Sequence, residues 1–426
     1  MGVTHESIIC PGCGCLCDDL DVTLEGDRIV EVGNVCLWGV SRFFHAKKFH
    51  PKKDRHRFTE PQVRHQGRRQ TVSYERALAE AARLLSRAKR PLIYGLTNSG
   101  SWAQEAALKL ARSLRARLEP ADLAFKAPYY QSIQRHGVTW ASLEVIRDEA
   151  DAVLFWGANP IHSAPRHVVR HAVFARGRFT ERGVEDRQVA AVDIYKTELT
   201  RFAPLFIKIQ PGQELDLVQG IAGTLTGEPV PSPPIRGTRR LAQFLAKATC
   251  GVIFCGRGVS YGPAEELFDR LARLVAFLNQ DKRFFLFPLS GDFNSSGLYH
   301  LLLNEVGLAG APDFGPAEVT THFTPVDFRE VDAVLVTGAD LLWFLSAEQV
   351  EDLKRRQVPI VALSPFANRT TSQAAVILPS ALTGIEAAEV AYRMDGLPLL
   401  LKQVAPSVLP ADHQVLTDLQ RLIGAQ

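Results

Sequence analysis

A repeated order of short apolar runs, glycine-containing turns and amphipathic stretches restricts this chain to an α/β fold from about residue 74 onward. Residues 90–118 predict a strand, a turn at Gly95 and then a helix whose apolar positions recur about every 3.6 residues. Residues 250–278 repeat that order around Gly256. No apolar stretch approaches the ~20 residues that a membrane span needs, so the sequence predicts no membrane association.

The ends of several apolar runs resemble one another in pairs. Residues 151–160 resemble 332–341, residues 189–198 resemble 359–368, and residues 206–214 resemble 375–386. Two related Rossmann-like units account for this similarity. Convergence is the alternative, because any buried strand that ends in a turn has this pattern. The proline-rich residues 226–237 predict a crossing between layers, and residues 413–423 predict a short helix.

Five of the seven cysteines lie within residues 10–36. Cys10, Cys13, Cys17 and Cys36 follow the spacing C-x2-C-x3-C-x18-C, with Cys15 as an additional thiol. Thiolates at this spacing on a turning backbone converge on one centre, which predicts a [4Fe–4S] cluster or a structural zinc ion. A reduced cysteine cluster that holds no metal is the alternative.

The residues around these cysteines favour convergence. Gly12 and Gly14 permit tight turns between the first thiols. Residues 19–36 predict two strands joined near Gly26 and Asp27, which would carry the fourth cysteine back to the others. The remaining cysteines flank an apolar run and are expected to pack as small apolar side chains; they are Cys250 and Cys255.

The formal net charge of +3 conceals a basic segment. Residues 41–70 contain ten Lys or Arg and two Asp or Glu, whereas the rest of the chain contains 39 basic and 44 acidic residues. Such a segment attracts anions, but no nucleic-acid-binding motif accompanies it. We therefore expect a solvated linker or a contact with an acidic partner, and no nucleic acid. The first residues lack a secretory pattern, which predicts a cytoplasmic protein.

Five segments of the sequence resemble the molybdopterin-dependent oxidoreductases, and among them the B subunit of formylmethanofuran dehydrogenase. They are CPGCGCLCDDL (10–20), NVCLWG (34–39), WGANPIHSAPRH (156–167), VDIYKTELT (192–200) and GIEAAEVAYRMDG (384–396). The resemblance implies a small cysteine-rich β domain followed by two Rossmann-like domains, one inserted in the other, without the C-terminal barrel of the wider family. The implied boundaries are 1–58 for the cysteine-rich [4Fe–4S]-type domain, 59–138 and 229–405 for the parent domain, 139–228 for the inserted domain and 406–426 for a C-terminal tail.

The resemblance also implies a redox centre, but three positions depart from its pattern. Active relatives are expected to hold a bis-pterin tungsten or molybdenum centre between the Rossmann-like domains and to reduce carbon dioxide to formate. Here Phe125 stands where a metal-ligating cysteine is expected, Trp38 where a basic residue lies between cluster and pterin, and Tyr195 where a nucleotide-clamping arginine is expected. Because a metal centre depends on its protein ligand and surroundings, we expect molybdopterin or tungstopterin to be absent.

A bacterial branch of this resemblance, the formyltransferase/hydrolase complex of one-carbon metabolism, fits such a loss. It implies that formyl groups pass from formyl-tetrahydromethanopterin, via a methanofuran-type carrier, to formate without a net redox step. The first hypothesis is therefore a non-redox scaffold that works beside the amidohydrolase-type A, the C and the formyltransferase subunits of one complex. One alternative is an active tungsten or molybdenum formylmethanofuran dehydrogenase, and another is a binding protein without an enzyme partner.

These hypotheses define the candidate site residues, none of which is expected to be catalytic. Spacing and resemblance assign four metal ligands, namely Cys10, Cys13, Cys17 and Cys36. The resemblance implies a vestigial pterin-nucleotide loop, with Asn159, Ser163, Asp193 and Thr197. A third set, Glu386, Arg393 and Asp395, either contacts a pterin or forms buried ion pairs, because both roles need the same residue types.

Overall fold

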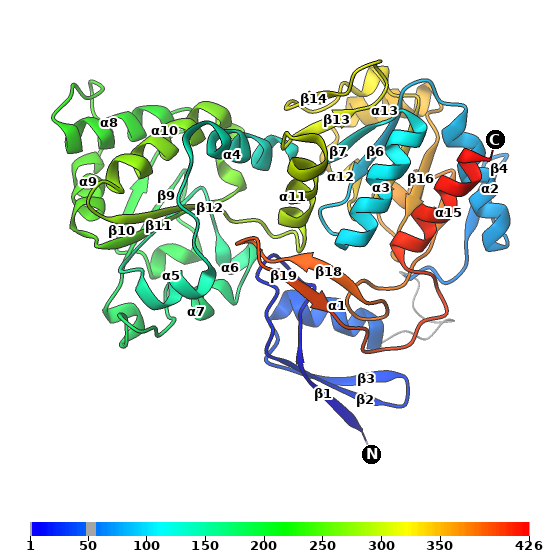
Figure 1. The fold of residues 1–426 in the computed structure, drawn as a ribbon, viewed down its shortest axis with the longest axis horizontal. Helices are drawn as coiled ribbons and strands as arrows, with labels where there is room; N and C mark the ends of the chain where they lie inside the picture. Colours follow the sequence, from blue (N-terminus) through cyan, green and yellow to red (C-terminus); the bar gives the residue numbers. More distant parts are fainter. Residues whose placement is uncertain (1, 48–56, 426) are drawn as a thin grey trace.

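In the computed structural model, which describes residues 2–47 and 57–425, two large sheets stand side by side above a small N-terminal β domain (Figure 1). The small domain contains the antiparallel strands β1 (Val3–Ile8), β2 (Leu20–Glu25) and β3 (Arg28–Gly33), followed by helix α1 (Leu37–Lys47). Glu25 pairs with Arg28, so the turn between β2 and β3 consists of Gly26 and Asp27, as predicted.

The larger sheet has nine strands in the order β14-β13-β7-β6-β15-β16-β17-β4-β5. The five strands from β7 to β17 are parallel, and the flanking strands join them antiparallel. The strands are β4 (Gln62–His65), β5 (Arg68–Thr71), β6 (Pro91–Gly95), β7 (Arg117–Pro120), β13 (Ala311–Asp313), β14 (Thr320–His322), β15 (Ala333–Thr337), β16 (Ile360–Leu363) and β17 (Val376–Leu378). The helices of this part are α2 (Tyr74–Ser86), α3 (Ser101–Leu114), α11 (Ser295–Val306), α12 (Leu341–Phe344), α13 (Ala347–Arg355), α14 (Arg369–Gln373) and α15 (Asp412–Gly424).

The second sheet has five parallel strands in the order β10-β9-β8-β11-β12. They are β8 (Ala152–Trp156), β9 (Gln188–Asp193), β10 (Leu205–Lys208), β11 (Cys250–Cys255) and β12 (Arg283–Pro288). The helices around it are α4 (Leu123–His136), α5 (Leu143–Glu149), α6 (Pro160–Ser163), α7 (His167–Arg170), α8 (Glu214–Thr226), α9 (Thr238–Lys247) and α10 (Ala264–Leu278). Helix α10 buries Leu267, Leu271, Leu274 and Leu278, whose helical spacing places one apolar face toward the core.

The five parallel strands of each sheet follow a corresponding order. The larger sheet runs β17-β16-β15-β6-β7, and the second runs β10-β9-β8-β11-β12. Strand β8 thus corresponds to β15, β9 to β16 and β10 to β17, which are the three pairs of segments that resemble each other in sequence. This correspondence supports two related Rossmann-like units over convergence.

Strand pairing places one domain boundary differently from the sequence prediction. Residues 229–405 were expected to belong to the parent domain, but β11 pairs with β8 of the second sheet and β12 pairs with β11. Residues 226–237 therefore connect α8 to α9 within one unit instead of crossing between layers. The prolines show only where regular structure is interrupted, whereas the partner of the next strand depends on long-range packing.

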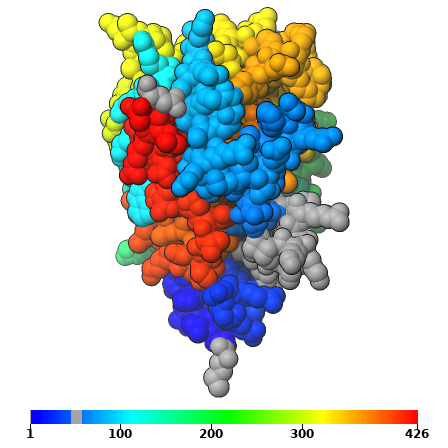
Figure 2. All heavy atoms as spheres, turned by 90° about the vertical axis from the view of Figure 1, so that its right-hand side faces the viewer, coloured from blue at the N-terminus to red at the C-terminus, as the bar shows by residue number. Residues whose placement is uncertain are grey.

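The C-terminal residues pack against the helices of the larger sheet and against the N-terminal domain. Residues 406–426 were expected to form a tail, but α15 buries Val415, Leu416 and Leu419 in the core against α2 and α3. Before it, β18 (Glu389–Tyr392) and β19 (Pro398–Leu401) form a ribbon above the N-terminal domain (Figure 1), and Figure 2 shows orange-to-red C-terminal atoms directly above the blue N-terminal ones. The Met394 N–H donates to the Gly14 carbonyl at 2.8 Å, which fixes the ribbon to the cysteine loop.

Gly95 ends β6 where this strand passes β15, and it gives a first testable prediction. Its φ is 113°, and an added Cβ would lie 2.2 Å from the Thr337 carbonyl oxygen. Gly95→Ala should therefore lower the free energy of unfolding by about 3 kcal/mol or more, because backbone strain and a steric clash add. Chemical denaturation measures this. Gly67→Ala, at φ 77° with no atom within 4 Å, should cost only about 1 kcal/mol; equal losses would contradict the prediction.

Candidate functional site

The first three predicted ligands lie on one closed loop. The Cys10 N–H donates to the Cys17 carbonyl at 2.8 Å, and the Leu16 N–H donates to the Cys13 carbonyl at 3.1 Å. All thiols of the loop are buried, while Cys36, which precedes α1, is half-buried. The four predicted ligands line one small cavity of about 10 Å³. The structure therefore brings together the four cysteines that the spacing selected.

Glycines allow the backbone to approach the Cys10 sulfur and the neighbouring loop closely, because they have no side chain. An added Cβ would lie 3.1 Å from the Cys10 sulfur at Gly12 and 3.0 Å from it at Gly39. At Gly14 it would lie 3.2 Å from the Asp292 carbonyl oxygen. Neither Gly12 nor Gly14 has a positive φ, so these glycines permit the turns of the loop by leaving space for the neighbouring atoms and not by adopting a left-handed conformation.

The thiols fit a thiolate-ligated centre in type and convergence. Burial raises the pKa of Cys10 and of Cys17, whereas a hydrogen bond from Cys15 lowers the pKa of Cys13. The cavity that these cysteines line, of about 10 Å³, has room for at most one water. Within the described ranges, no group of three or more His, Cys, Asp or Glu side chains has the geometry to hold a single metal ion. The identity of any bound centre is thus a matter for proposal.

Arg42 is the site residue that the sequence reasoning missed. It lies on α1 and contributes positive charge beside Cys10, Cys13 and Asp292. The resemblance led us to expect a basic residue at position 38, where this chain has Trp38. The indole N–H of Trp38 donates to the His162 carbonyl in α6. Arg42 lies four residues further along the same helix and hence on the same face. That helical spacing is the sequence signal that identifies it.

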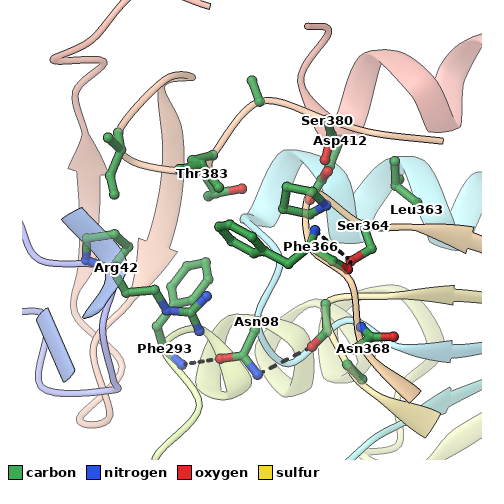
Figure 3. A pocket seen from close by; sticks show the side chains of 17 residues that line it. Arg42, Asn98, Phe293, Leu363, Ser364, Phe366, Asn368, Ser380, Thr383 and Asp412 are labelled. Carbon is green, nitrogen blue, oxygen red and sulfur yellow. Dashed lines mark hydrogen bonds between the residues drawn. The ribbon is translucent and has the colours of Figure 1, made fainter. Parts of the chain in front are cut away.

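A pocket of about 240 Å³ opens beside Arg42, at the carboxyl ends of the larger sheet's strands (Figure 3). Arg42 lines one side and Asp412 and Ser380 line another (Figure 3). Burial raises the pKa of Asp412 to about 6. Asn98 also lines the pocket, with its amide donating to the Gly338 carbonyl and accepting from the Phe293 N–H, both at 3.3 Å. Crevices at such strand ends are usual ligand sites in α/β folds.

A buried polar network joins the strand ends of both sheets next to this pocket. Its contacts are Ser295 to Asp122 at 2.5 Å, Lys126 to Ser296 at 3.4 Å, Asn98 to Asp292 at 2.9 Å, and the ion pair of Arg257 with Asp292. Burial lowers the pKa of Lys126 to about 8, with Asp122 and Asp292 acting in the opposite direction. The charges on the loops between the sheets therefore compensate one another.

Phe125 lies in the apolar core and not in the pocket. It follows Asp122 by three residues on α4 and is 2% exposed. Its ring centroid lies 6.2 Å from that of Phe268 on α10. The side chain offers no atom that ligates a metal, in line with the departure noted in the sequence.

The predicted nucleotide-loop residues lie on two neighbouring loops of the second sheet. Asn159 donates to Glu198 at 3.2 Å, and Ser163 donates to the Asn159 carbonyl at 3.2 Å. Asp193 accepts from the Ile194 N–H at 2.7 Å, and the Thr197 carbonyl accepts from the Thr200 N–H. The structure thus brings Asn159 and Ser163 together, while the buried side-chain oxygen of Asn159 has no hydrogen-bond partner among the described residues.

The third set of candidate residues forms buried ion pairs. Glu386 pairs with Arg57 at 2.5 Å, and Arg393 pairs with Asp395 at 2.6 Å. Arg57 belongs to the basic segment, so its described part is anchored to the fold at this point. Residues 48–56 of that segment lie outside the described residues.

His167 lies beneath the second sheet and gives a prediction about pH. It is fully buried, with the Phe254 ring edge-on at 4.5 Å, and burial lowers its pKa from 6.5 to about 3. The unfolded chain therefore binds a proton between pH 6.5 and 3 that the folded chain does not, so stability falls as the pH falls through this window. His167→Phe should remove about 2–3 kcal/mol of the loss between pH 7.5 and 4.5. Urea unfolding at both pH values measures this; an unchanged pH dependence would contradict it.

Comparison with known proteins assigns the family. Residues 57–412 match the Molybdopterin oxidoreductase family, and the chain therefore belongs to it. Within that family it is 31% identical to the B subunit of the tungsten-containing formylmethanofuran dehydrogenase 2 of Methanocaldococcus jannaschii and 29% identical to the protein of that name from Methanococcus maripaludis, each over 96% of both chains. These relatives place it with the B subunits of formylmethanofuran dehydrogenase, as the sequence motifs predicted.

Solved structures share the fold. A chain of the formyltransferase/hydrolase complex (FhcABCD) from Methylorubrum extorquens, solved in complex with methylofuran, superposes with a TM-score of 0.67 at 18% identity, covering 86% of this chain and 99% of that one. Acetylene hydratase from Pelobacter acetylenicus gives a TM-score of 0.70 at 12% identity, covering 99% and 69%. At these identities the likeness concerns the fold alone. No helix within the described ranges has both the length and the apolar character to cross a bilayer.

Proposed function

We propose that this chain is a non-redox subunit of a complex that moves formyl groups from formyl-tetrahydromethanopterin, via a methanofuran-type carrier, to formate. The observation that carries the proposal is the burial of Phe125 against Phe268, at the position where the sequence resemblance leads us to expect a metal-ligating cysteine. A phenyl ring provides no donor atom, and Phe125 is not among the residues that line the pocket.

The polar network next to Phe125 supports the same proposal. Lys126 and Arg257 put positive charge between the two sheets, and Asp122 and Asp292 neutralise it. Buried charges of this kind are stable only when they are paired and hydrogen-bonded. The loops that meet between the sheets are thus held together by the chain's own residues.

The proposed role assigns the following partners and cofactor. The chain joins the amidohydrolase-type A, the C and the formyltransferase subunits of one complex in the cytoplasm, supported by its likeness to a chain of a formyltransferase/hydrolase complex. Cys10, Cys13, Cys17 and Cys36 hold a [4Fe–4S] cluster, supported by their convergence on one cavity. Such a cluster supplies one-electron transfer in redox proteins, and here it fixes the cysteine loop.

A second candidate is an active tungsten or molybdenum subunit of formylmethanofuran dehydrogenase. Two observations favour it: the named relatives are tungsten-containing, and Arg42 restores a cation between the cysteines and the pocket. In this case Asn159, Ser163, Asp193 and Thr197 would face a pterin nucleotide.

Elemental analysis of the complex, purified without oxygen, distinguishes the two candidates. The non-redox proposal expects about four iron atoms per chain and no tungsten, molybdenum or extractable pterin. Stoichiometric tungsten or molybdenum would overturn it and establish the dehydrogenase. Purification of the chain alone, without an amidohydrolase-type partner, would overturn the scaffold role separately.

A further inference from the structure

A second pocket, of about 350 Å³, lies at the amino-terminal ends of β9 and β10, away from the loops discussed above. Its charged lining residues are all basic: Arg187, Arg240 and Lys247. The amides of Gln188 and Gln243 complete its polar lining. No proposed role of the chain uses this end of the second sheet.

Arg187 places a buried positive charge against this pocket without a carboxylate in contact. It is 5% exposed. All its N–H groups donate to uncharged oxygens, namely the carbonyls of Ala150, Ala172, Ala175 and Arg147 and the Thr180 hydroxyl. Its charge is thus held by dipoles and is not neutralised by a contacting acid. Burying a cation in this way is costly unless an anion approaches.

Two acids attract Arg187 without contacting it, and each is already paired with another arginine. Asp148 and Asp186 act on Arg187 only at a distance. Asp148 is bound by Arg147 at 2.8 Å, and Asp186 is bound by Arg182 at 2.6 Å. The pocket therefore keeps the excess positive charge of Arg187.

Two further cations face the same pocket from one side of α9. Arg240, Gln243 and Lys247 are three and four residues apart, so they lie along one face of the helix. All are exposed, and neither Arg240 nor Lys247 forms a salt bridge with any residue in the described ranges. Their donors remain available to a ligand, whereas those of Arg187 are occupied.

We propose that this pocket is a binding site for a small, multiply charged anion, either a phosphate compound or a polycarboxylate. Arg240 and Lys247 supply the hydrogen-bond donors, since guanidinium and ammonium groups match phosphate and carboxylate oxygens. Arg187 supplies fixed charge from below, which raises the local concentration of anions. This site is independent of whether the chain serves a redox or a non-redox complex.

The test is isothermal titration of the purified complex with pyrophosphate and, separately, with citrate at constant ionic strength. We expect saturable binding of one anion per chain, and a loss of affinity of about tenfold or more in Arg240→Ala/Lys247→Ala. The matched control is Arg236→Ala/Arg239→Ala, which removes the same charge from exposed neighbours that do not line the pocket.

The results distinguish a phosphate compound from a polycarboxylate, and they also show when the proposed site is wrong. Tighter binding of pyrophosphate supports a phosphate compound, and tighter binding of citrate supports a polycarboxylate. Equal losses in the two double variants would show unspecific attraction to a basic surface and would overturn the site. Absence of saturable binding to the unaltered complex would overturn it as well.

Discussion

Cys13→Ser is expected to lower the iron content of the purified complex from about four atoms per chain to less than one. Cys13 lies in the centre of the closed loop and shares its cavity with the three other predicted ligands. Its pKa is lowered, with the hydrogen bond from Cys15 as the main cause, whereas burial raises the pKa of Cys10 and of Cys17, so Cys13 ionises more readily than these two. Thiolates are the ligands of iron–sulfur clusters, and a serine oxygen replaces one poorly. Elemental analysis together with the visible spectrum of the same sample measures the loss.

The matched control is Cys250→Ser, because this thiol is also buried but begins β11, outside the cysteine loop. It should leave the iron content unchanged. Full iron content in Cys13→Ser would exclude this residue as a ligand. One zinc ion per chain in the unaltered complex, in place of iron, would instead favour the structural zinc site that the spacing also permits.

The strands were predictable because each carries its own local signal. The runs that became β8, β9 and β10 were paired in the sequence with those that became β15, β16 and β17, and the sheets place them at corresponding positions. The assignment of β11 and β12 was not predictable in the same way. Both are largely apolar strands that fit either sheet; β11 pairs with β8 across about a hundred residues of chain, and β12 pairs with β11.

The site was predictable where spacing alone determines convergence. The four cysteines lie together because the closed loop and the short β2–β3 hairpin restrict the positions that their backbone can adopt. Arg42 was not predicted because the family motif places its basic residue at position 38. In a helix, residue i+4 lies on the same face as residue i, so Arg42 lies on the same face of α1 as Trp38. The polar network of Asp122, Lys126 and Asp292 was missed for another reason: its members come from loops of both sheets and have no common sequence pattern.

Arg393→Ala is expected to lower the free energy of unfolding by about 3–5 kcal/mol, the largest loss that a single side chain in this ribbon should cause. Arg393 is 4% exposed and donates to both oxygens of Asp395, at 2.8 and 2.6 Å, and to both oxygens of Glu144 on α5, at 2.6 Å each. The same contacts lower the pKa of Glu144 to about 2. Removing the guanidinium leaves Asp395, which is 2% exposed, as an uncompensated buried charge. Chemical denaturation of the unaltered and variant proteins at neutral pH measures the loss.

An exposed ion pair with the same spacing serves as the control for Arg393 and Asp395. Arg329 and Asp327 are also two residues apart and joined by several hydrogen bonds, but they are exposed, so Arg329→Ala should change stability little. A second variant separates charge from packing: adding Asp395→Asn to Arg393→Ala should restore part of the loss, because the amide oxygen can still accept from the Leu143 N–H and no buried charge remains. If the double variant is no more stable than Arg393→Ala, the loss comes from packing, and the ion pair does not hold the ribbon to α5 by charge. Recovery would instead assign to these residues the structural role that their types alone left open against pterin contact.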